Sequence, residues 1–302
     1  MNTKTWTNHW VCDPAFWALK PLPVYHKEHD KTFSRPHHQE SLENVHTLFR
    51  QKFVITSADM EENAVFLDIS ADDYYKLYIN GEFICQGPAP AYTSSYNYNQ
   101  INISKFLNQG KNIIAVHVYY QGLINRVWNS GDNRMGLVAD ILHSGEFEFG
   151  TDESWLYDKA EEYSGDTTEY STQFREDIDF CKKKADWNNI NSARDCYKKS
   201  KLVKCQDWRF KDKPVPNVEV YTVKPSKIIK KGEAVYLMDF GNEITGQIYF
   251  KAKGEEGQKV CVKYGEELDD DGSVRYKMRC NCNYYDVCTL SGGEDEFEFF
   301  DY

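Results

Sequence analysis

Apolar and polar residues alternate along this chain in short runs, and turn-forming residues separate the runs. Alternation over about four to eight residues is the pattern of a half-buried β-strand, because successive side chains point to opposite faces of a sheet. The clearest runs in the first half lie at Ala64–Ser70, Tyr74–Gly87, Leu107–Gly122 and Gly136–Trp155. No long helical periodicity interrupts them, so this half is expected to form an antiparallel β-sandwich.

Two of these runs contain a turn at their centre and are predicted to be β-hairpins. Asn80-Gly81 divides the run at 74–87, and Ser144-Gly145 divides the run at 136–155. Asn-Gly is a strong hairpin signal, because both residues tolerate the positive φ angles of a tight two-residue turn. Adjacent antiparallel strands are therefore expected on either side of each turn.

A second group of strand patterns follows a proline-containing stretch at Lys211–Ser226. Proline fixes φ and removes a backbone donor, which favours an extended connection over regular structure. The later patterns lie at Ala234–Phe240, Gln247–Lys253, Lys259–Tyr264, Tyr284–Leu290 and Glu296–Phe300. The pair at 247–264, joined by a short glycine-flanked loop, is predicted to be a hairpin.

The chain is therefore predicted to be all-β, with two consecutive antiparallel β-sandwich domains. We expect an irregular arm, a first sandwich, a linker and a second sandwich, at residues 1–47, 48–213, 214–229 and 230–302. Polar residues 164–210 are expected to form long loops on the first sandwich. The final strand pattern, 296–300, has no turn after it, which predicts a second sandwich truncated at its C-terminal end. An unpaired edge of this kind would favour self-association.

The tripeptide Asp239-Phe240-Gly241 also occurs in protein kinases, where it holds magnesium. A kinase additionally needs a glycine-rich loop, a strand lysine and a His-Arg-Asp loop upstream, and none of these patterns occurs here. Gly241 is instead predicted to allow a tight bend entering a strand, so that Asp239-Phe240-Gly241 opens a strand of the sandwich.

Composition excludes several classes of partner. The formal net charge is −11, whereas nucleic acids and anionic membranes require a basic face. No apolar run approaches the roughly 20 residues that span a bilayer, and the start lacks a signal-peptide pattern. The nine cysteines are scattered and odd in number, unlike a paired secreted framework. We expect a cytoplasmic protein with no nucleic-acid or membrane partner.

One loop gathers the planar and polar side chains that sugar-binding sites commonly use. It follows the strand pattern 107–122 and contains two glycines. Aromatic faces pack on the C–H surfaces of sugars, while carboxylate, amide and guanidinium groups bond to hydroxyls. The candidate sugar-binding residues are Tyr119, Tyr120, Arg126, Trp128, Asn129, Asp132 and Arg134. The alternative is that these aromatics simply cover the end of the sandwich.

Several landmarks, in their order along the chain, resemble the N-terminal half of the bacterial α-L-rhamnosidases of glycoside hydrolase family 78. In the first module they are Leu48–Phe53, Ala71–Pro88, Phe106–Gly122, Thr151–Trp155 and Phe174–Asp179. In the second module they are Asp239–Phe250, Gly265–Leu268, Asp271–Gly272 and Tyr284–Tyr302. The resemblance implies a jelly-roll or galactose-binding-like sandwich followed by a concanavalin-like sandwich.

The resemblance also implies a longer parent enzyme that hydrolyses terminal α-L-rhamnosides with inversion, using two glutamates on a helical (α/α)₆ barrel. No such barrel is encoded in this sequence, so no catalytic residue is assigned and the chain alone is expected to be inactive. The implied partners are rhamnose-containing glycosides or oligosaccharides and the parent's barrel. Two rival interpretations stay open: a self-standing carbohydrate-binding protein, and an interaction module that uses sheet edges.

Neither a cofactor nor a metal site is predicted. Some members of the resembled family contain a calcium-dependent rhamnose-binding module, which draws attention to Asp72-Asp73. Adjacent carboxylates at the start of a strand are more commonly solvated turn residues, and that is the interpretation favoured here. Leu268–Ser273 lacks the alternate-residue ligands and distal glutamate of a calcium loop.

Overall fold

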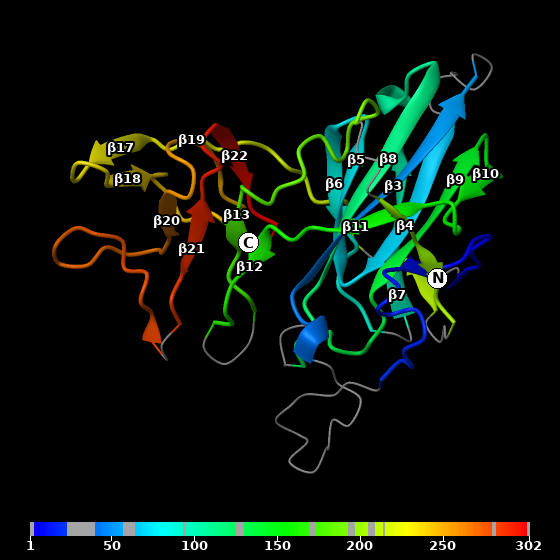
Figure 1. The fold of residues 1–302 in the computed structure, drawn as a ribbon, viewed down its shortest axis with the longest axis horizontal. Helices are drawn as coiled ribbons and strands as arrows, with labels where there is room; N and C mark the ends of the chain where they lie inside the picture. Colours follow the sequence, from blue (N-terminus) through cyan, green and yellow to red (C-terminus); the bar gives the residue numbers. More distant parts are fainter. Residues whose placement is uncertain are drawn as a thin grey trace, which may run out of the picture. The chain divides into compact units, whose positions relative to one another are not determined.

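The computed structural model describes residues 3–22, 40–56, 64–92, 95–124, 130–168, 173–192, 197–204, 209–213, 215–279 and 282–300. The chain divides into two compact units (Figure 1). The first contains Met1–Ala160 and Lys184–Val218, and the second contains Glu161–Lys183 and Glu219–Tyr302. Regular structure in the described ranges consists of strands and two short 3₁₀ helices, η2 (Glu40–Leu42) and η5 (Ser104–Phe106). The predicted all-β fold of β-sandwich domains is confirmed.

The first unit is built from two large sheets. The eight-stranded sheet runs in the order β1 (Thr3–Lys4), β16 (Phe210–Asp212), β7 (Tyr96–Asn102), β4 (Val65–Asp72), β9 (Gly136–His143), β2 (Val11–Cys12) and β15 (Lys201–Leu202), with β10 (Glu146–Gly150) paired to β9. The six-stranded sheet runs in the order β14 (Lys198–Lys199), β11 (Leu156–Lys159), β3 (Val45–Ile55), β8 (Gly110–Tyr120), β5 (Tyr74–Ile79) and β6 (Glu82–Gly87). All pairs are antiparallel except β16 with β7.

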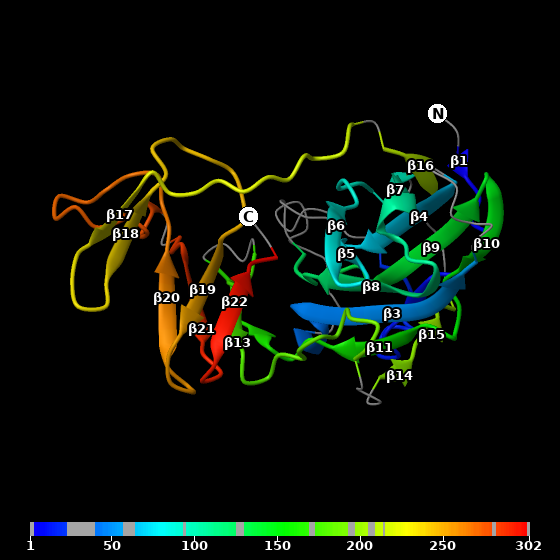
Figure 2. The same cartoon turned by 90° about the horizontal axis from the view of Figure 1, so that it is seen from above.

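The core of the first unit lies between these sheets, as the alternating pattern requires. Figure 2 shows β4 and β9 of one sheet above β3 and β11 of the other. Phe49 of β3 and Val116 of β8 face each other in register, and both are fully buried. They pack in one cluster with Leu67 of β4 and Leu77 of β5. Burial of these inward faces is the main stabilising contribution to the unit.

Both predicted hairpins of the first unit are confirmed. β5 pairs with β6 across Asn80-Gly81, whose φ angles are 52° and 88°. β9 pairs with β10 across Ser144-Gly145, whose φ angles are 49° and 87°. Positive φ at both central residues matches the right-handed twist of the flanking strands, which is why these turns favour Asn and Gly.

The N-terminal segment differs from the irregular arm expected at 1–47. β1 pairs with β16, and β2 pairs with both β9 and β15, so the segment contributes two short strands to the eight-stranded sheet. Trp10 and Phe16 are each 1% exposed. These two large apolar side chains anchor the segment to the first unit. Its strands are only two residues long, so no alternating pattern identified them from the sequence.

The predicted domain limits also differ from the observed units. Residues 161–183, expected to belong to the first sandwich at 48–213, belong to the second unit. Residues 184–218 return to the first unit, and β14, β15 and β16 supply strands to its two sheets. The unit boundary at Val218–Glu219 falls inside the range predicted as a linker, 214–229.

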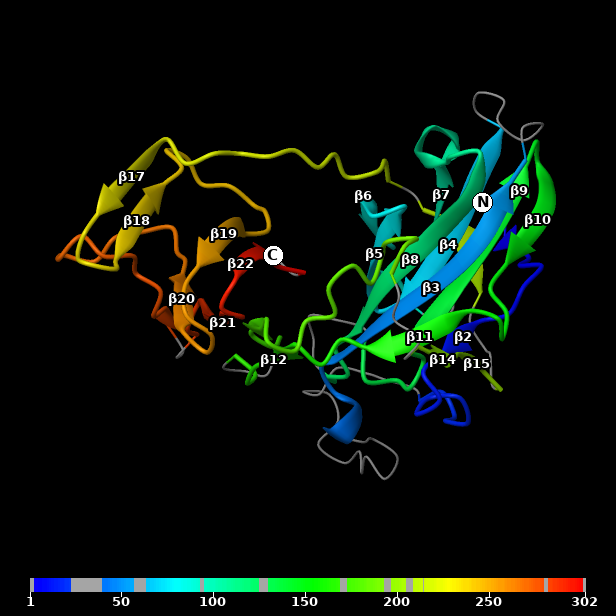
Figure 3. The same cartoon turned by 45° about the horizontal axis from the view of Figure 1, so that its top comes forward.

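The second unit contains one four-stranded sheet and two two-stranded sheets. The larger runs in the order β12 (Tyr163–Ser164), β13 (Asp177–Asp179), β21 (Tyr285–Thr289) and β20 (Lys259–Lys263). The smaller ones pair β17 (Lys227–Lys230) with β18 (Tyr236–Asp239), and β19 (Tyr249–Lys253) with β22 (Glu294–Glu298) (Figure 3). Gly241 has the positive φ of a tight bend, 81°, but the prediction that Asp239-Phe240-Gly241 opens a strand is wrong, because β18 ends at Asp239 and β19 begins only at Tyr249.

One prediction for the second unit is wrong. Residues 247–264 do not form a hairpin, because β19 pairs with β22 while β20 pairs with β21. A partner distant in sequence replaced the local one. In the segment 296–300, Phe297, Phe299 and Phe300 are at most 3% exposed, and Phe297 stacks on Phe250 with ring centroids 4.5 Å apart. Among the described residues, β22 pairs with β19 on one side only, and self-association through this edge stays a prediction.

No helix in the described ranges is long and apolar enough to span a membrane.

Trp155 provides a test of the packing of the first unit. Its side chain is fully buried in the main core, and its indole N–H donates to the Gly150 carbonyl at 3.0 Å. Trp155→Ala is expected to destabilise the first unit by about 3–5 kcal/mol, because it leaves a cavity and an unpaired carbonyl. Urea unfolding followed by hydrogen exchange in β3 and β8 measures the loss. Trp17→Ala, at a residue 37% exposed, is the control and should cost far less.

Candidate functional site

A cluster of carboxyl groups lies at one end of the first unit, where β4 ends and β9 begins. We call it the carboxyl cluster: Asp72, Asp73 and Asp132, with Tyr96 and Arg134. Asp72 is the last residue of β4 and pairs in register with Gly136 of β9, which follows the segment 130–135. The antiparallel pairing therefore brings Asp72 close to Asp132 and Arg134. Exposure is 1% for Asp72, 3% for Asp132 and 5% for Arg134.

Hydrogen bonds within the cluster partly compensate for the burial of these carboxyl groups. The Tyr96 hydroxyl donates to Asp72 Oδ2. Arg134 Nη1 donates to Asp132 Oδ2 at 2.7 Å and to the Leu22 carbonyl at 3.1 Å. The Arg134 guanidinium thus donates hydrogen bonds to both a carboxylate and a backbone carbonyl.

Backbone groups on either side of the cluster complete the arrangement. The Leu22 N–H donates to the Asp132 carbonyl at 2.9 Å, and the Gln121 N–H donates to Asp73 Oδ2 at 2.7 Å. The Gly122 N–H donates to Ser130 Oγ at 2.7 Å. The loop after β8 is consequently held at both ends by the groups that surround the carboxylates.

Burial governs the protonation of the cluster. Desolvation, reinforced by the charge of Asp73, raises the pKa of Asp72 well above its usual range. Desolvation and the charge of Asp72 raise the pKa of Asp132 to about 8, against the opposing effect of Arg134. Desolvation also raises the pKa of Asp73 to about 6. With one cation among three carboxyl groups, the cluster retains protons at neutral pH.

Tyr119 and Tyr120, adjacent at the end of β8, point to opposite faces of the sheet. The Tyr120 ring lies in the core, 5.1 Å from the Phe16 ring, and its hydroxyl accepts the Asn133 N–H at 2.9 Å. Tyr119 stacks on His46 with ring centroids 4.3 Å apart on the outer face. Strand alternation therefore separates two residues that the sequence analysis grouped together.

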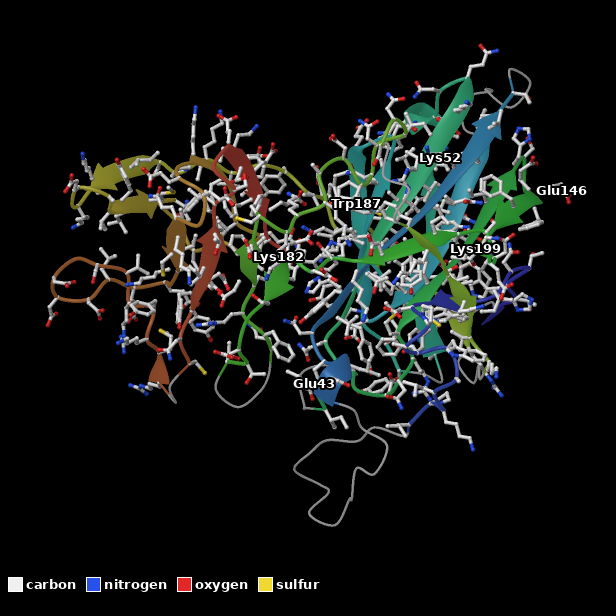
Figure 4. The ribbon with its side chains drawn as sticks, in the orientation of Figure 1. Glu43, Lys52, Glu146, Lys182, Trp187 and Lys199 are labelled. Carbon is white, nitrogen blue, oxygen red and sulfur yellow. The ribbon has the colours of Figure 1, made fainter. Side chains whose placement is uncertain are left out.

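The outer face around Tyr119 is covered by other aromatic and cationic side chains. His46 Nδ1 and His117 Nε2 are 2.9 Å apart, and the Tyr78 ring lies 5.5 Å from the ring of Trp187, which is labelled in Figure 4. Arg50 Nη1 donates to the Trp187 carbonyl at 3.1 Å. Trp187 therefore fixes the segment after 184 over this face of the sheet.

The structure brings together part of the predicted sugar-binding group. Tyr120 lies next to the segment that carries Asp132 and Arg134, while Tyr119 faces away from it. Arg126, Trp128 and Asn129 lie outside the described residues. The four described members are each at most 5% exposed.

Sequence reasoning did not connect Asp72, Asp73 and Tyr96 with one another or with the loop after β8. The interpretation of Asp72-Asp73 as solvated turn residues is wrong, since Asp72 is buried and bonded to Tyr96. The sequence signal available was Tyr96 in a polar loop next to a strand pattern. Among the residues that the structure describes, no three His, Cys, Asp or Glu side chains converge in a way that could hold a metal ion.

The second unit corresponds to a known class of domain. Residues 229–300 match the family model described as the bacterial α-L-rhamnosidase concanavalin-like domain. The α-L-rhamnosidase of Formosa agariphila is 23% identical over 222 residues, which cover 66% of this chain and 22% of that protein. The chain therefore spans about a fifth of the length of this curated relative.

Solved structures of α-L-rhamnosidases resemble the fold of this chain over most of its length. The α-L-rhamnosidase of Dictyoglumus thermophilum matches 98% of this chain with a TM-score of 0.68 and 22% identity, over 32% of its own length. The Streptomyces avermitilis α-L-rhamnosidase, solved with L-rhamnose, matches 85% of this chain with a TM-score of 0.65 and 18% identity, over 26% of its own length. The resemblance to α-L-rhamnosidases is confirmed, over a β-sandwich region that forms part of those longer chains.

Asp72→Asn tests the protonation of the carboxyl cluster, because asparagine resembles a protonated aspartate. A pKa raised by folding stabilises at low pH, and this stabilisation is lost as pH rises above about 4. The native chain should therefore lose stability relative to the variant as pH rises from about 4 towards the raised pKa of Asp72, by about 1.4 kcal/mol for each unit of pKa elevation. Urea titrations of both proteins measure the difference.

Glu146→Gln is the matched control, because Glu146 is an exposed carboxylate of the same unit (Figure 4). It should leave the pH dependence unchanged. Parallel pH profiles for the native chain and Asp72→Asn would contradict the assignment of a raised pKa to Asp72.

Proposed function

We propose that this chain is an accessory region of an α-L-rhamnosidase, a longer protein that hydrolyses terminal α-L-rhamnosides with inversion. The observation that carries the proposal is the extent of the fold match. It covers 98% of this chain and only 32% of the Dictyoglumus thermophilum enzyme. Further support comes from the concanavalin-like family match at residues 229–300.

The burial of the carboxyl cluster supports an accessory role. Inverting hydrolysis needs a carboxylic acid and a carboxylate base about 6.5–9.5 Å apart, with room for the sugar and a water between them. Asp72 and Asp132 are at most 3% exposed and are bonded to Tyr96 and Arg134. Carboxyl groups engaged in this way are not disposed to act as the acid and base of hydrolysis. In this proposal catalysis belongs to the parent's helical barrel, which is the chain's main partner.

The chain alone should release no measurable product from an aryl α-L-rhamnoside, because it lacks the groups that protonate the leaving oxygen and activate water. A chromogenic assay at high protein concentration measures this, with a complete α-L-rhamnosidase as the positive control. Turnover by the purified chain that disappears in Asp132→Asn would overturn the accessory role.

Sugar contact by the loop after β8 is part of the same proposal. The residues concerned are Tyr119, Tyr120, Arg126, Trp128, Asn129, Asp132 and Arg134. The bonds from Arg134 and Asp132 to the backbone of Leu22 support this loop on the sandwich. Rhamnose-containing glycosides are the proposed ligands. A self-standing carbohydrate-binding protein is the alternative if binding occurs without any parent enzyme.

Titration of the chain with L-rhamnose, followed by NMR, tests the sugar contact. Shifts are expected to concentrate in residues 119–134, and Trp128→Ala should weaken binding about tenfold, since stacking on a sugar contributes roughly 1–2 kcal/mol. Trp17→Ala is the control and should leave binding unchanged. Shifts confined to the second unit would contradict the assignment.

A cytoplasmic location is proposed on the basis of the cysteines. The described ones, Cys12, Cys85, Cys181, Cys261, Cys282 and Cys288, are free thiols, as is usual in reducing compartments.

A further inference from the structure

The chain contributes to the second unit twice. Residues 161–183 enter it, the chain then returns to the first unit, and 219–302 form the remainder. The family match covers only 229–300 and therefore omits the earlier piece. Residues 161–183 make backbone and side-chain contacts that identify them as a component of the second unit.

Its backbone completes the central sheet of the second unit. β13 lies parallel to β21, with Ile178 opposite Cys288 and Asp179 opposite Thr289. The Phe180 N–H donates to the Thr289 carbonyl at 2.9 Å. Since β20 occupies the other side of β21, the side bound by β13 would otherwise be an open strand edge.

Its apolar side chains complete the core. Ile178 and Phe180 are 3% and 7% exposed and belong to the buried cluster that contains Cys288, Leu290 and Phe297. The Phe180 and Phe297 ring centroids are 4.1 Å apart. Removing the segment would expose apolar surface on both sides of this contact, at a cost proportional to its area.

Its polar side chains bond to main-chain groups of the 285–300 segment. Glu176 Oε2 accepts the Phe300 N–H at 2.6 Å, and Asp177 Oδ1 accepts the Val287 N–H at 2.9 Å. In return, Asp286 Oδ1 accepts the Glu176 N–H at 2.9 Å. These bonds fix the register of the incoming strand, because a shift by one residue would move every side chain to the other face.

A cation and an aromatic ring complete the interaction. The Arg175 guanidinium lies 4.4 Å from the centroid of the Tyr285 ring, and its Nη2 donates to Asp177 Oδ2 at 2.7 Å. The Asp177 carboxylate is thereby held between an arginine on its own segment and the Val287 N–H of the second unit.

We propose that the second unit is a strand-acceptor module whose ligand is this chain's own segment 173–183. Main-chain pairing with β21 supplies the affinity, and alternate side chains supply the specificity, as in other cases of β-strand addition. The acceptor site takes a strand of the form apolar–Arg–acidic–acidic–apolar in parallel orientation. The segment is a separable ligand of the unit, so it stays bound after its covalent connections are cut.

The test uses the full chain with two engineered protease sites, one replacing residues 169–172 and one at the exposed residues Ala185–Asp186. After cleavage, the released peptide 173–185 should co-elute with the rest of the protein in size exclusion and separate only in denaturant. Phe180→Asp should release it under native conditions. Lys182→Ala is the control, because the Lys182 side chain is 59% exposed. Separation of the peptide from the cleaved native sequence would overturn the proposal.

A measurement on the uncut chain keeps the inference testable if the inserted sites disturb folding. In Phe180→Asp, hydrogen exchange in β20, β21 and β22 should become about tenfold faster or more, while β3 and β8 of the first unit keep their protection. Faster exchange confined to residues 173–183, with β20 to β22 unchanged, would overturn the proposal.

Discussion

The pairing of β3 with β8 is the interaction on which the first unit depends. Eleven residue pairs, from Val45 opposite Tyr120 to Ile55 opposite Gly110, form one uninterrupted antiparallel ladder. Its inward positions, such as Phe49 and Val116, supply the core. Its outward positions carry His46, His117 and Arg50, which the segment after 184 covers. The ladder also ends at Tyr120, at the start of the loop that contributes Asp132 and Arg134 to the carboxyl cluster.

Because a two-residue period fixes the face of every side chain, local features of this architecture were predictable from sequence. The strand at 110–120 follows from alternation, and the turn at Asn80-Gly81 follows from the positive φ that both residues tolerate. Pairing between distant strands was not predictable in the same way. Nothing local indicates that β19 pairs with β22 across some forty residues instead of with β20.

The candidate site was predictable only in part, for a related reason. Asp132 and Arg134 stand in a polar loop, where binding groups are expected. Asp72 and Tyr96 lie on the outer face of the eight-stranded sheet, which a strand pattern alone marks as solvated. The N-terminal segment covers that face, with Trp10 edge-on to Tyr96 at 6.4 Å between ring centroids. Whether an outer face is buried depends on such a distant covering segment, which a local strand pattern does not reveal. For this reason Asp72 was interpreted as solvated although it is buried.

Burial also gives the carboxyl cluster its chemistry, since desolvation raises the pKa of all three aspartates and most strongly favours the protonated forms of Asp72 and Asp132. An NMR titration of the side-chain carboxyl carbons tests this account most directly. It predicts that Asp72 loses its proton only at a pH well above the ordinary range of an aspartate, about pH 4. An Asp72 carboxyl that titrates below pH 4, together with the exposed groups, would contradict it.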